Sequence, residues 1–541
     1  MNNRIYNVLF NTHTISGIII SAALYVIFFA GSFSFFRDEI ISWERNEPVM
    51  ERGMNEVNFD LLLDSINSRQ AAYGRDITFN QYYEERRVGV SLGPSKDTLA
   101  PKETAAGSFF YLDKETMKSY DYFSSYSIGE FLYRLHFFAQ LNLFGRSGYF
   151  LAGLVAFFFL FAVITGVLVH WNKIVSNFYI FRPGAKWKTI WTDAHTALGI
   201  LGLPYQFIFA LTGTYLIIST LVMAPPVVAL FYDNDATKMY ADFGVGGENY
   251  PMLMEREQPP VHINDLVNRT RETWKDFDIR TVTVYNYGDA NMHVAVEGLP
   301  LNTRSFLGKG KMVFKAATGE VVDVKDPYHG ASYLDGATNV LTKLHFGDFG
   351  GTGLRVIYFI LGLVSCFVII SGVMIWLVAR DKKTVSERKR RFNAWLVWIY
   401  LAVCLSMFPA TAITFVGVKV FVTAFDPSRM HTIFRIFFYS WLVLSVVFTL
   451  KRDNYFTNKY TLISGGFIGL MIPIVNGLVS GNWMWVSLHA GYYDIFFVDV
   501  FWLLLSLTAL IIAFRLRKNK TAIAVRPPKK IKPKENLIPV D

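Results

Sequence analysis

The sequence predicts a polytopic α-helical membrane protein with about eight transmembrane helices and two small α+β domains outside the membrane. Of the 541 residues, 52% are hydrophobic and the mean hydropathy is +0.29, which is too apolar for an ordinary soluble protein of this length. Windows of about 18 or more predominantly apolar residues are long enough to cross a bilayer. Eight such windows lie near 15–36, 148–170, 196–224, 354–378, 394–418, 432–450, 459–480 and 495–513.

Basic residues predict the orientation, because short loops rich in Lys and Arg stay on the cytoplasmic side. The loops concerned follow the second, fourth, sixth and eighth windows and contain Lys173, Arg182, Lys186 and Lys188, then Arg380 to Arg391, then Lys451 and Arg452, then the basic tail. Both termini are therefore expected in the cytoplasm, and the polar stretches 37–135 and 225–344 outside it. The net charge of +10 is explained by this topology and by contact with anionic lipid, and it does not indicate nucleic-acid binding.

The first window is longer than the apolar region of a signal peptide and no clear cleavage site follows it, so we expect a retained anchor. The two cysteines, Cys366 and Cys404, lie inside apolar windows. The outer regions therefore carry no disulfide and no covalent haem-attachment motif.

An internal duplication relates the first two spans to the next two. "HTISGIIISAALYVIFFAG" from His13 resembles "HTALGILGLPYQFIFALTG" from His195, and Leu-His at 135–136 and at 344–345 precedes a Gly-containing turn and a Gly-Leu-Val run. Each copy contains one of the polar stretches, and such parallel repeats are common in membrane folds.

These features divide the chain into ten parts. They are the first span (1–36), an outer α+β domain (37–135), the second span with its entry segment (136–170), a cytoplasmic loop (171–194), the third span (195–224), a second outer domain (225–344), the fourth span with its entry segment (345–379), a basic loop (380–392), an accessory four-helix bundle (393–516) and a basic tail (517–541).

Each outer stretch contains a short helical pattern followed by hairpins. The helical patterns lie around 59–73 and 263–276. Alternating β-branched and aromatic residues around polar, Gly-bearing turns predict hairpins within 109–123, 279–298 and 311–324.

Four histidines form two pairs by depth. His13 and His195 open outward-going spans at the cytoplasmic face, and His136 and His345 precede inward-going spans at the outer face. Ionisable residues at such positions usually face the protein interior and have a function. Two neutral imidazoles on facing helices suit a six-coordinate haem iron, while a proton pathway, a metal-ion site and purely structural histidines are the alternatives. His170 is the rival ligand at the cytoplasmic depth.

Glycines accompany these histidines at helical spacing. Gly17 and Gly199 lie one turn from His13 and His195 and would leave a gap for a flat macrocycle. Gly31 and Gly213 lie eighteen residues after the same histidines, which is five turns, so they return to the same face at the outer depth, where a second haem would lie. The alternative explanation is that small residues only allow close helix packing.

The other histidines carry weaker signals. His262, His293 and His329 lie in polar outer segments and are expected to be solvated, and His431 and His489 have no predicted role. The chain has no dinucleotide-binding or phosphate-binding fingerprint and no ferredoxin-type cysteine set, so an electron donor would be a separate molecule.

The order of motifs resembles the PepSY-associated transmembrane family over residues 5–380. The resemblance rests on the His-led spans, "FFRDEI" after the first span, "LHFGDFGGTGLRVIYFILGL" at the fourth and the "TGEVVDV" hairpin. It implies PepSY-like outer domains, a bacterial inner-membrane location and two b-type haems, with His13, His136, His195 and His345 as iron ligands. It also implies a periplasm-facing reductase of ferric siderophores or other ferric chelates, which receives electrons from a quinol or a cytoplasmic reductase.

Two other functions remain as alternatives to an oxidoreductase. A siderophore or metal transporter would need ionisable residues near the bilayer centre, and the first four spans show none there. A membrane-anchored PepSY sensor or inhibitory module would not need histidines matched by depth. The four accessory spans have no counterpart in the resemblance.

Overall fold

The computed structural model describes residues 2–517 with several gaps. The residues outside the description are 1, 50–53, 55, 56, 82, 83, 172, 173, 180, 181, 183, 184, 186, 243–249, 258–260, 302–307, 330, 331 and 518–541. Lys173, Lys186 and nearly all of the predicted basic tail therefore lie outside it.

Within the described residues, eight helical segments are long and apolar enough to cross a membrane. They are Asn3–Ser34, Ser147–His170, Leu203–Phe231, Gly351–Arg380, Glu387–Phe421, Arg429–Lys451, Asn454–Ser480 and Tyr493–Arg515. Each of them overlaps one of the eight predicted windows, although the third begins at Leu203 and not at 196, and this confirms a multi-pass helical membrane protein.

The first four spans form a core in which α1 (Asn3–Ser34) packs against α5 (Ser147–His170) and α13 (Gly351–Arg380). The expected third span is interrupted. α7 (Trp187–Leu201) packs against α13, and α8 (Leu203–Ile218) packs against α5. The break falls at Gly202, and Pro204 in the first turn of α8 has no N–H to continue the preceding helix.

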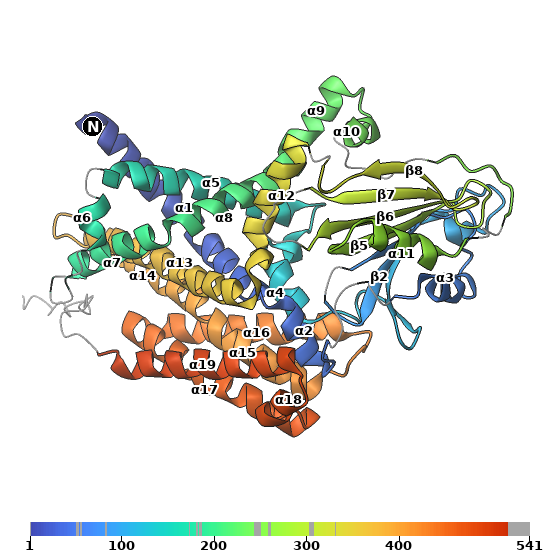
Figure 1. Ribbon diagram of the computed structural model, residues 1–541. Helices are drawn as coiled ribbons and strands as arrows, with labels where there is room; N and C mark the ends of the chain where they lie inside the picture. Colours follow the sequence, from blue (N-terminus) through green and yellow to red (C-terminus); the bar gives the residue numbers. More distant parts are fainter. Residues whose placement is uncertain are drawn as a thin grey trace, which may run out of the picture.

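The last four spans form a second layer on the core (Figure 1). This layer contains α14 (Glu387–Leu405), α15 (Met407–Phe421), α16 (Arg429–Lys451), α17 (Asn454–Ser480), α18 (Met484–His489) and α19 (Tyr493–Arg515). α14 contacts α13 and α1, and α17 packs against both α15 and α19.

The polar stretches together form one antiparallel sheet at one end of the helices (Figure 1). The strands are β1 (Ile77–Asn80), β2 (Arg87–Leu92), β3 (Ser108–Asp113), β4 (Ser119–Tyr120), β5 (Phe277–Tyr285), β6 (His293–Pro300), β7 (Gly310–Lys315) and β8 (Glu320–Lys325). Their order is β4-β3-β2-β1-β5-β6-β7-β8. The predicted hairpins are present, β1 and β2 were not predicted, and the two α+β regions share a continuous sheet.

The seam between the two halves is the pairing of β1 with β5, in which Thr78 faces Thr283. Beside the sheet, α3 (Phe59–Asn67) and α11 (Ile263–Thr273) share its hydrophobic core. The two helices also cap each other. Asp60 accepts from the N–H of Ile263 at 2.9 Å, and Asn264 accepts from the N–H of Phe59 at 2.8 Å. The internal duplication therefore extends to the sheet as two matching halves.

Two short helices connect the sheet to the spans. α2 (Arg37–Arg45) follows α1 and packs against α4 (Ile128–His136), α15 and α19. Trp43 donates to Asp499 of α19 at 2.8 Å, and Glu44 forms a buried ion pair with Arg429 of α16. α2 thus joins the core to the accessory layer through polar contacts at the sheet end.

The remaining helical elements are short and connect the larger ones. They are η1 (Lys102–Ala105), η2 (Ala139–Leu141), α6 (Ile174–Phe178), the π-helical turn η4 (Ser219–Met223), α9 (Ala224–Phe231), α10 (Ala236–Asp242), α12 (Tyr333–Phe346) and η5 (Asp348–Gly350).

Candidate functional site

Four of the predicted histidines meet in two pairs. The ring centres of His13, on α1, and His195, on α7, are 6.3 Å apart. Those of His136, the last residue of α4, and His345, near the end of α12, are 6.0 Å apart. The structure thus brings together the histidines that were paired by their predicted depth. Their role as haem ligands stays a prediction.

The two pairs lie at different levels of the core. His136 contacts the carbonyl of Ile27, fourteen residues after His13 on the same continuous helix. At 1.5 Å per residue, this separation is about 21 Å along the axis of α1. We call His13 and His195 the far pair, and His136 and His345 the sheet-side pair.

In the far pair, each imidazole is held through its Nδ1 atom. His13 Nδ1 donates to the carbonyl of Ala162 on α5 at 2.8 Å. His195 Nδ1 donates to the carbonyl of Val368 on α13 at 2.9 Å and lies 3.0 Å from the hydroxyl of Ser371. A neutral imidazole that donates from Nδ1 has its lone pair on Nε2, which is the tautomer that binds a metal.

The sheet-side pair follows the same rule. His136 Nδ1 donates to the carbonyl of Ile27 at 2.7 Å. His345 Nδ1 lies 2.7 Å from the hydroxyl of Thr212, which donates to the carbonyl of Ile208 and so accepts from His345. All four histidines therefore keep Nε2 free of these bonds and are oriented by a hydrogen bond to another helix.

Glycines on the facing helices make this approach possible. In three cases the accepting carbonyl lies four residues before a glycine, namely Gly166, Gly372 and Gly31. A Cβ on Gly31 would lie 2.4 Å from Nδ1 of His136, and one on Gly166 would lie 3.1 Å from Cε1 of His13. The missing side chain of Gly31 is thus required for the position of the His136 ring.

The other predicted glycines differ in their surroundings. A Cβ on Gly17 or Gly199 would meet no heavy atom within 4 Å, so there is open space one turn from His13 and from His195. Gly213 lines the sheet-side cavity, but its Cβ would lie 3.2 Å from that of Ala156. His13 and Gly31 lie on one continuous helix, α1, as predicted, whereas Gly202 interrupts the helix between His195 and Gly213.

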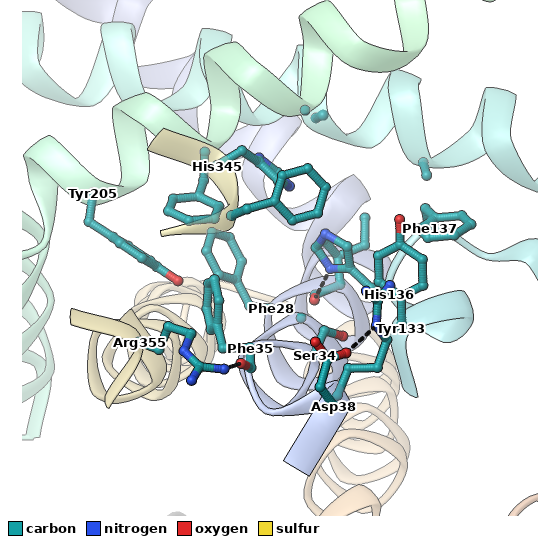
Figure 2. Close-up of a pocket in the computed structure, with 18 of the residues that line it drawn as sticks. Phe28, Ser34, Phe35, Asp38, Tyr133, His136, Phe137, Tyr205, His345 and Arg355 are labelled. Carbon is teal, nitrogen blue, oxygen red and sulfur yellow. Dashed lines mark hydrogen bonds and ion pairs between the residues drawn. The ribbon is translucent and has the colours of Figure 1, made fainter. Parts of the chain in front are cut away.

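A cavity of about 490 Å³ contains the sheet-side pair (Figure 2). Its apolar wall includes Phe28, Tyr205 and Phe209, and the ring centre of Phe209 lies 5.0 Å from that of His345. Volumes of this order are typical of cofactor and ligand sites.

Charged residues line the part of the cavity nearer the sheet. Arg355 pairs with Glu39 at 2.6 Å, and Arg280 pairs with Asp278 at 2.6 Å and with Glu84 at 3.0 Å. Burial raises the pKa of Asp278, although the guanidinium of Arg280 opposes the rise. We call Arg37, Glu39, Glu84, Arg280 and Arg355 the charged rim. It was not predicted, because its members come from α2, the segment after β1, β5 and α13.

The donor set and the spacing fit a haem with two axial imidazoles. A ring nitrogen binds a transition-metal ion at about 2 Å, so two opposite ligands place their ring centres about 6 Å apart. The observed 6.3 Å and 6.0 Å agree with this value. Among the described residues, no group of three or more His, Cys, Asp or Glu side chains could hold a bare metal ion.

The remaining histidines are placed differently. His170, the last residue of α5, lies near His13 and His195. The two rings that face each other in the far pair are nevertheless those of His13 and His195. His262 and His329 are exposed as expected. The expectation for His293 is wrong, because this residue is buried on β6 with its ring stacked 3.8 Å from that of Tyr250.

Thr212 is the site residue that sequence reasoning missed. Its signal was the position directly before Gly213, which matches Ser371 before Gly372. Both hydroxyls lie at a histidine Nδ1 in the structure.

Comparison with known families identifies a match over most of the chain. The model described as PepSY-associated TM region matches residues 10–379, which include both histidine pairs and the whole sheet. No curated protein matches the chain.

Proposed function

Because the chain belongs to the PepSY-associated transmembrane family, we propose that it is a membrane oxidoreductase that holds two b-type haems and passes electrons to an acceptor on the sheet side. The observation that carries the proposal is the pair of His–His contacts, with ring centres 6.3 Å and 6.0 Å apart, at two levels of one helical core. A bound haem supplies reversible one-electron chemistry.

The protein residues hold and orient the cofactor. The Nδ1 bonds to Ala162, Val368, Ile27 and Thr212 fix the tautomer and the ring plane of each ligand. Phe28, Tyr205 and Phe209 supply an apolar wall beside the sheet-side pair. Burial and these hydrogen bonds are the means by which the chain would set the reduction potentials.

We place the protein in a bacterial inner membrane with both termini in the cytoplasm and the sheet in the periplasm. The support is the positive charge of the loops that leave the helices at the end opposite the sheet, including residues 380–391. Electrons would enter at the far pair from a quinol or a cytoplasmic reductase.

The acceptor we propose is ferric iron in a siderophore or another ferric chelate. The sheet-side cavity extends from His136 and His345 to the rim formed by Arg37, Arg280 and Arg355, and so gives the acceptor a route to the sheet-side site. Reduction releases iron, because hard oxygen donors such as hydroxamate and catecholate hold Fe(II) less tightly than Fe(III).

The first experiment is a haem count on the purified protein with oxidised and dithionite-reduced spectra. We expect low-spin b-type spectra with about two haems per chain. His13→Ala and His345→Ala should each lower the count to about one, whereas the matched variant His329→Ala, at an exposed residue, should keep two. A colourless protein from cells supplied with haem would overturn the proposal.

The acceptor is tested separately. The dithionite-reduced protein is mixed with ferric chelates, and Fe(II) is trapped with ferrozine. Re-oxidation without trapped Fe(II) would keep the oxidoreductase and reject ferric chelates as the acceptor.

A further inference from the structure

A hollow of about 680 Å³ lies between the end of α13 and the start of α14, at the end of the helices opposite the sheet. Three cationic side chains line it, namely Arg380 of α13 and Arg388 and Lys389 of α14. Among the described residues, no carboxylate lines it. The hollow therefore favours an anion.

The neighbouring acids are occupied by other cations. Asp381 pairs with Arg390 at 3.5 Å, and Glu387 pairs with Arg391 at 2.5 Å. Within the part of the chain that the structure describes, Arg388 and Lys389 make no ion pair and both are exposed. Their charge is available to a ligand.

An apolar stripe continues from the hollow along α14. Phe392, Trp395 and Leu396 are 59%, 47% and 39% exposed, and they follow Arg388 at the i+4, i+7 and i+8 positions of the same helix face. On a membrane-spanning helix, an exposed apolar stripe faces acyl chains. The positive hollow lies at the end of this stripe, since Phe392 belongs to both. A phosphate bound in the hollow would therefore lie next to acyl chains on the stripe.

We propose that an anionic phospholipid binds here, with its phosphate among Arg380, Arg388 and Lys389 and an acyl chain along Phe392, Trp395 and Leu396. Basic pockets between transmembrane helices recognise such headgroups. A general excess of basic residues in short loops explains the charge of this segment but not its combination with a hollow formed by two helices.

A lipid in this hollow would contact both the core and the accessory layer. α13 carries the carbonyl of Val368 and the glycine Gly372, which meet His195, and α14 is the first helix of the accessory layer. A lipid between them would join the two layers at the end where α2 does not reach. Bound anionic lipid should therefore raise the thermal stability of the whole chain.

The test uses the full-length protein, delipidated in detergent, with native mass spectrometry after addition of phosphatidylglycerol or phosphatidylcholine. We expect retained phosphatidylglycerol and a loss of at least about tenfold in its affinity for the double variant Arg388→Gln/Lys389→Gln. The matched control is Lys451→Gln/Arg452→Gln, which removes the same charge from another loop and should bind as the unchanged protein does. Equal retention by both double variants, or equal binding of phosphatidylcholine, would overturn the proposal.

Two further measurements keep the result unambiguous. Melting curves in phosphatidylcholine test whether each variant is folded. We expect both to fold, because the substituted side chains are exposed. Inorganic phosphate is the second probe. If phosphate alone binds and stabilises the unchanged protein while phosphatidylglycerol does not, the occupant is a soluble anion and the lipid proposal fails.

Discussion

At the residue scale, the position of a histidine ring depends on a glycine in the facing helix. Gly31 has no side chain, and that absence lets the ring of His136 reach the carbonyl of Ile27. Helical spacing predicted the depth of Gly31 correctly, but the space beside it was predicted to hold a macrocycle. Spacing along one helix cannot show which side chain of another helix fills the gap.

Gly31→Ala tests this contact. The new Cβ would lie 2.4 Å from Nδ1 and 2.7 Å from Cε1 of His136, so the ring must move and lose its bond to Ile27. We expect the haem count to fall from about two to about one per chain, as read from the haemochrome spectrum. Gly336→Ala is the matched control, because its Cβ would meet no heavy atom within 4 Å, and it should leave the count unchanged.

Thr212→Val tests the hydroxyl that orients His345. Valine keeps the shape and removes the acceptor of the Nδ1 proton, and the loss of such a partner weakens metal binding by about 10–100-fold. The rate of haem transfer to apomyoglobin should therefore rise. In Thr214→Val the lost hydroxyl donates to the carbonyl of Ala210 within its own helix and contacts no histidine among the described residues, so this control should transfer haem at the original rate. Equal rates in the two variants would contradict the role of Thr212.

At the element scale, hydropathy predicted the spans because about 20 apolar residues are needed to cross a bilayer wherever they lie in the fold. The break between α7 and α8 was missed, because Gly202 and Pro204 lie inside an uncharged run that hydropathy treats as uniform. The strand β1 was missed because it has four residues, and its pairing with β5 comes from a distant part of the chain.

The connector α2 gives a prediction at this scale. Glu44 and Arg429 are 1% and 2% exposed, so Glu44→Gln leaves a buried guanidinium without its counter-charge. Breaking a buried pair in this way costs about 3–5 kcal/mol, so the melting temperature in detergent should fall clearly. Glu387→Gln breaks the exposed pair with Arg391 and should change stability by less than about 1 kcal/mol. Similar melting temperatures for the two variants would contradict a stabilising role for the Glu44–Arg429 contact.

At the scale of the whole molecule, the duplication predicted from the His-led spans extends through the sheet. The symmetry of the strand order about the β1–β5 seam could not be read from the sequence, since two separate sheets satisfy the same hairpin pattern. The pairing of the histidines could be predicted, because the order and direction of the spans determine the depth of each histidine. The charged rim could not be predicted, because it assembles from four distant segments of the chain.

The orientation of the whole chain is testable with single cysteines. Cys366 and Cys404 are buried, so they give little background labelling. Ser119→Cys on β4 should react with a membrane-impermeant maleimide in spheroplasts, whereas Lys382→Cys should react only after permeabilisation. Reaction of Lys382→Cys in sealed spheroplasts would reverse the proposed topology.

The seam of the sheet also sets an order of events during synthesis. Thr78 and Thr283 bond across it although 205 residues separate them. The ribosome must therefore deliver the second and third spans before β1 can find its neighbour, and closing so long a loop is slow. Until β5 has been made, the first half of the sheet has an open edge at β1, whose unpaired N–H and C=O groups can pair with another chain.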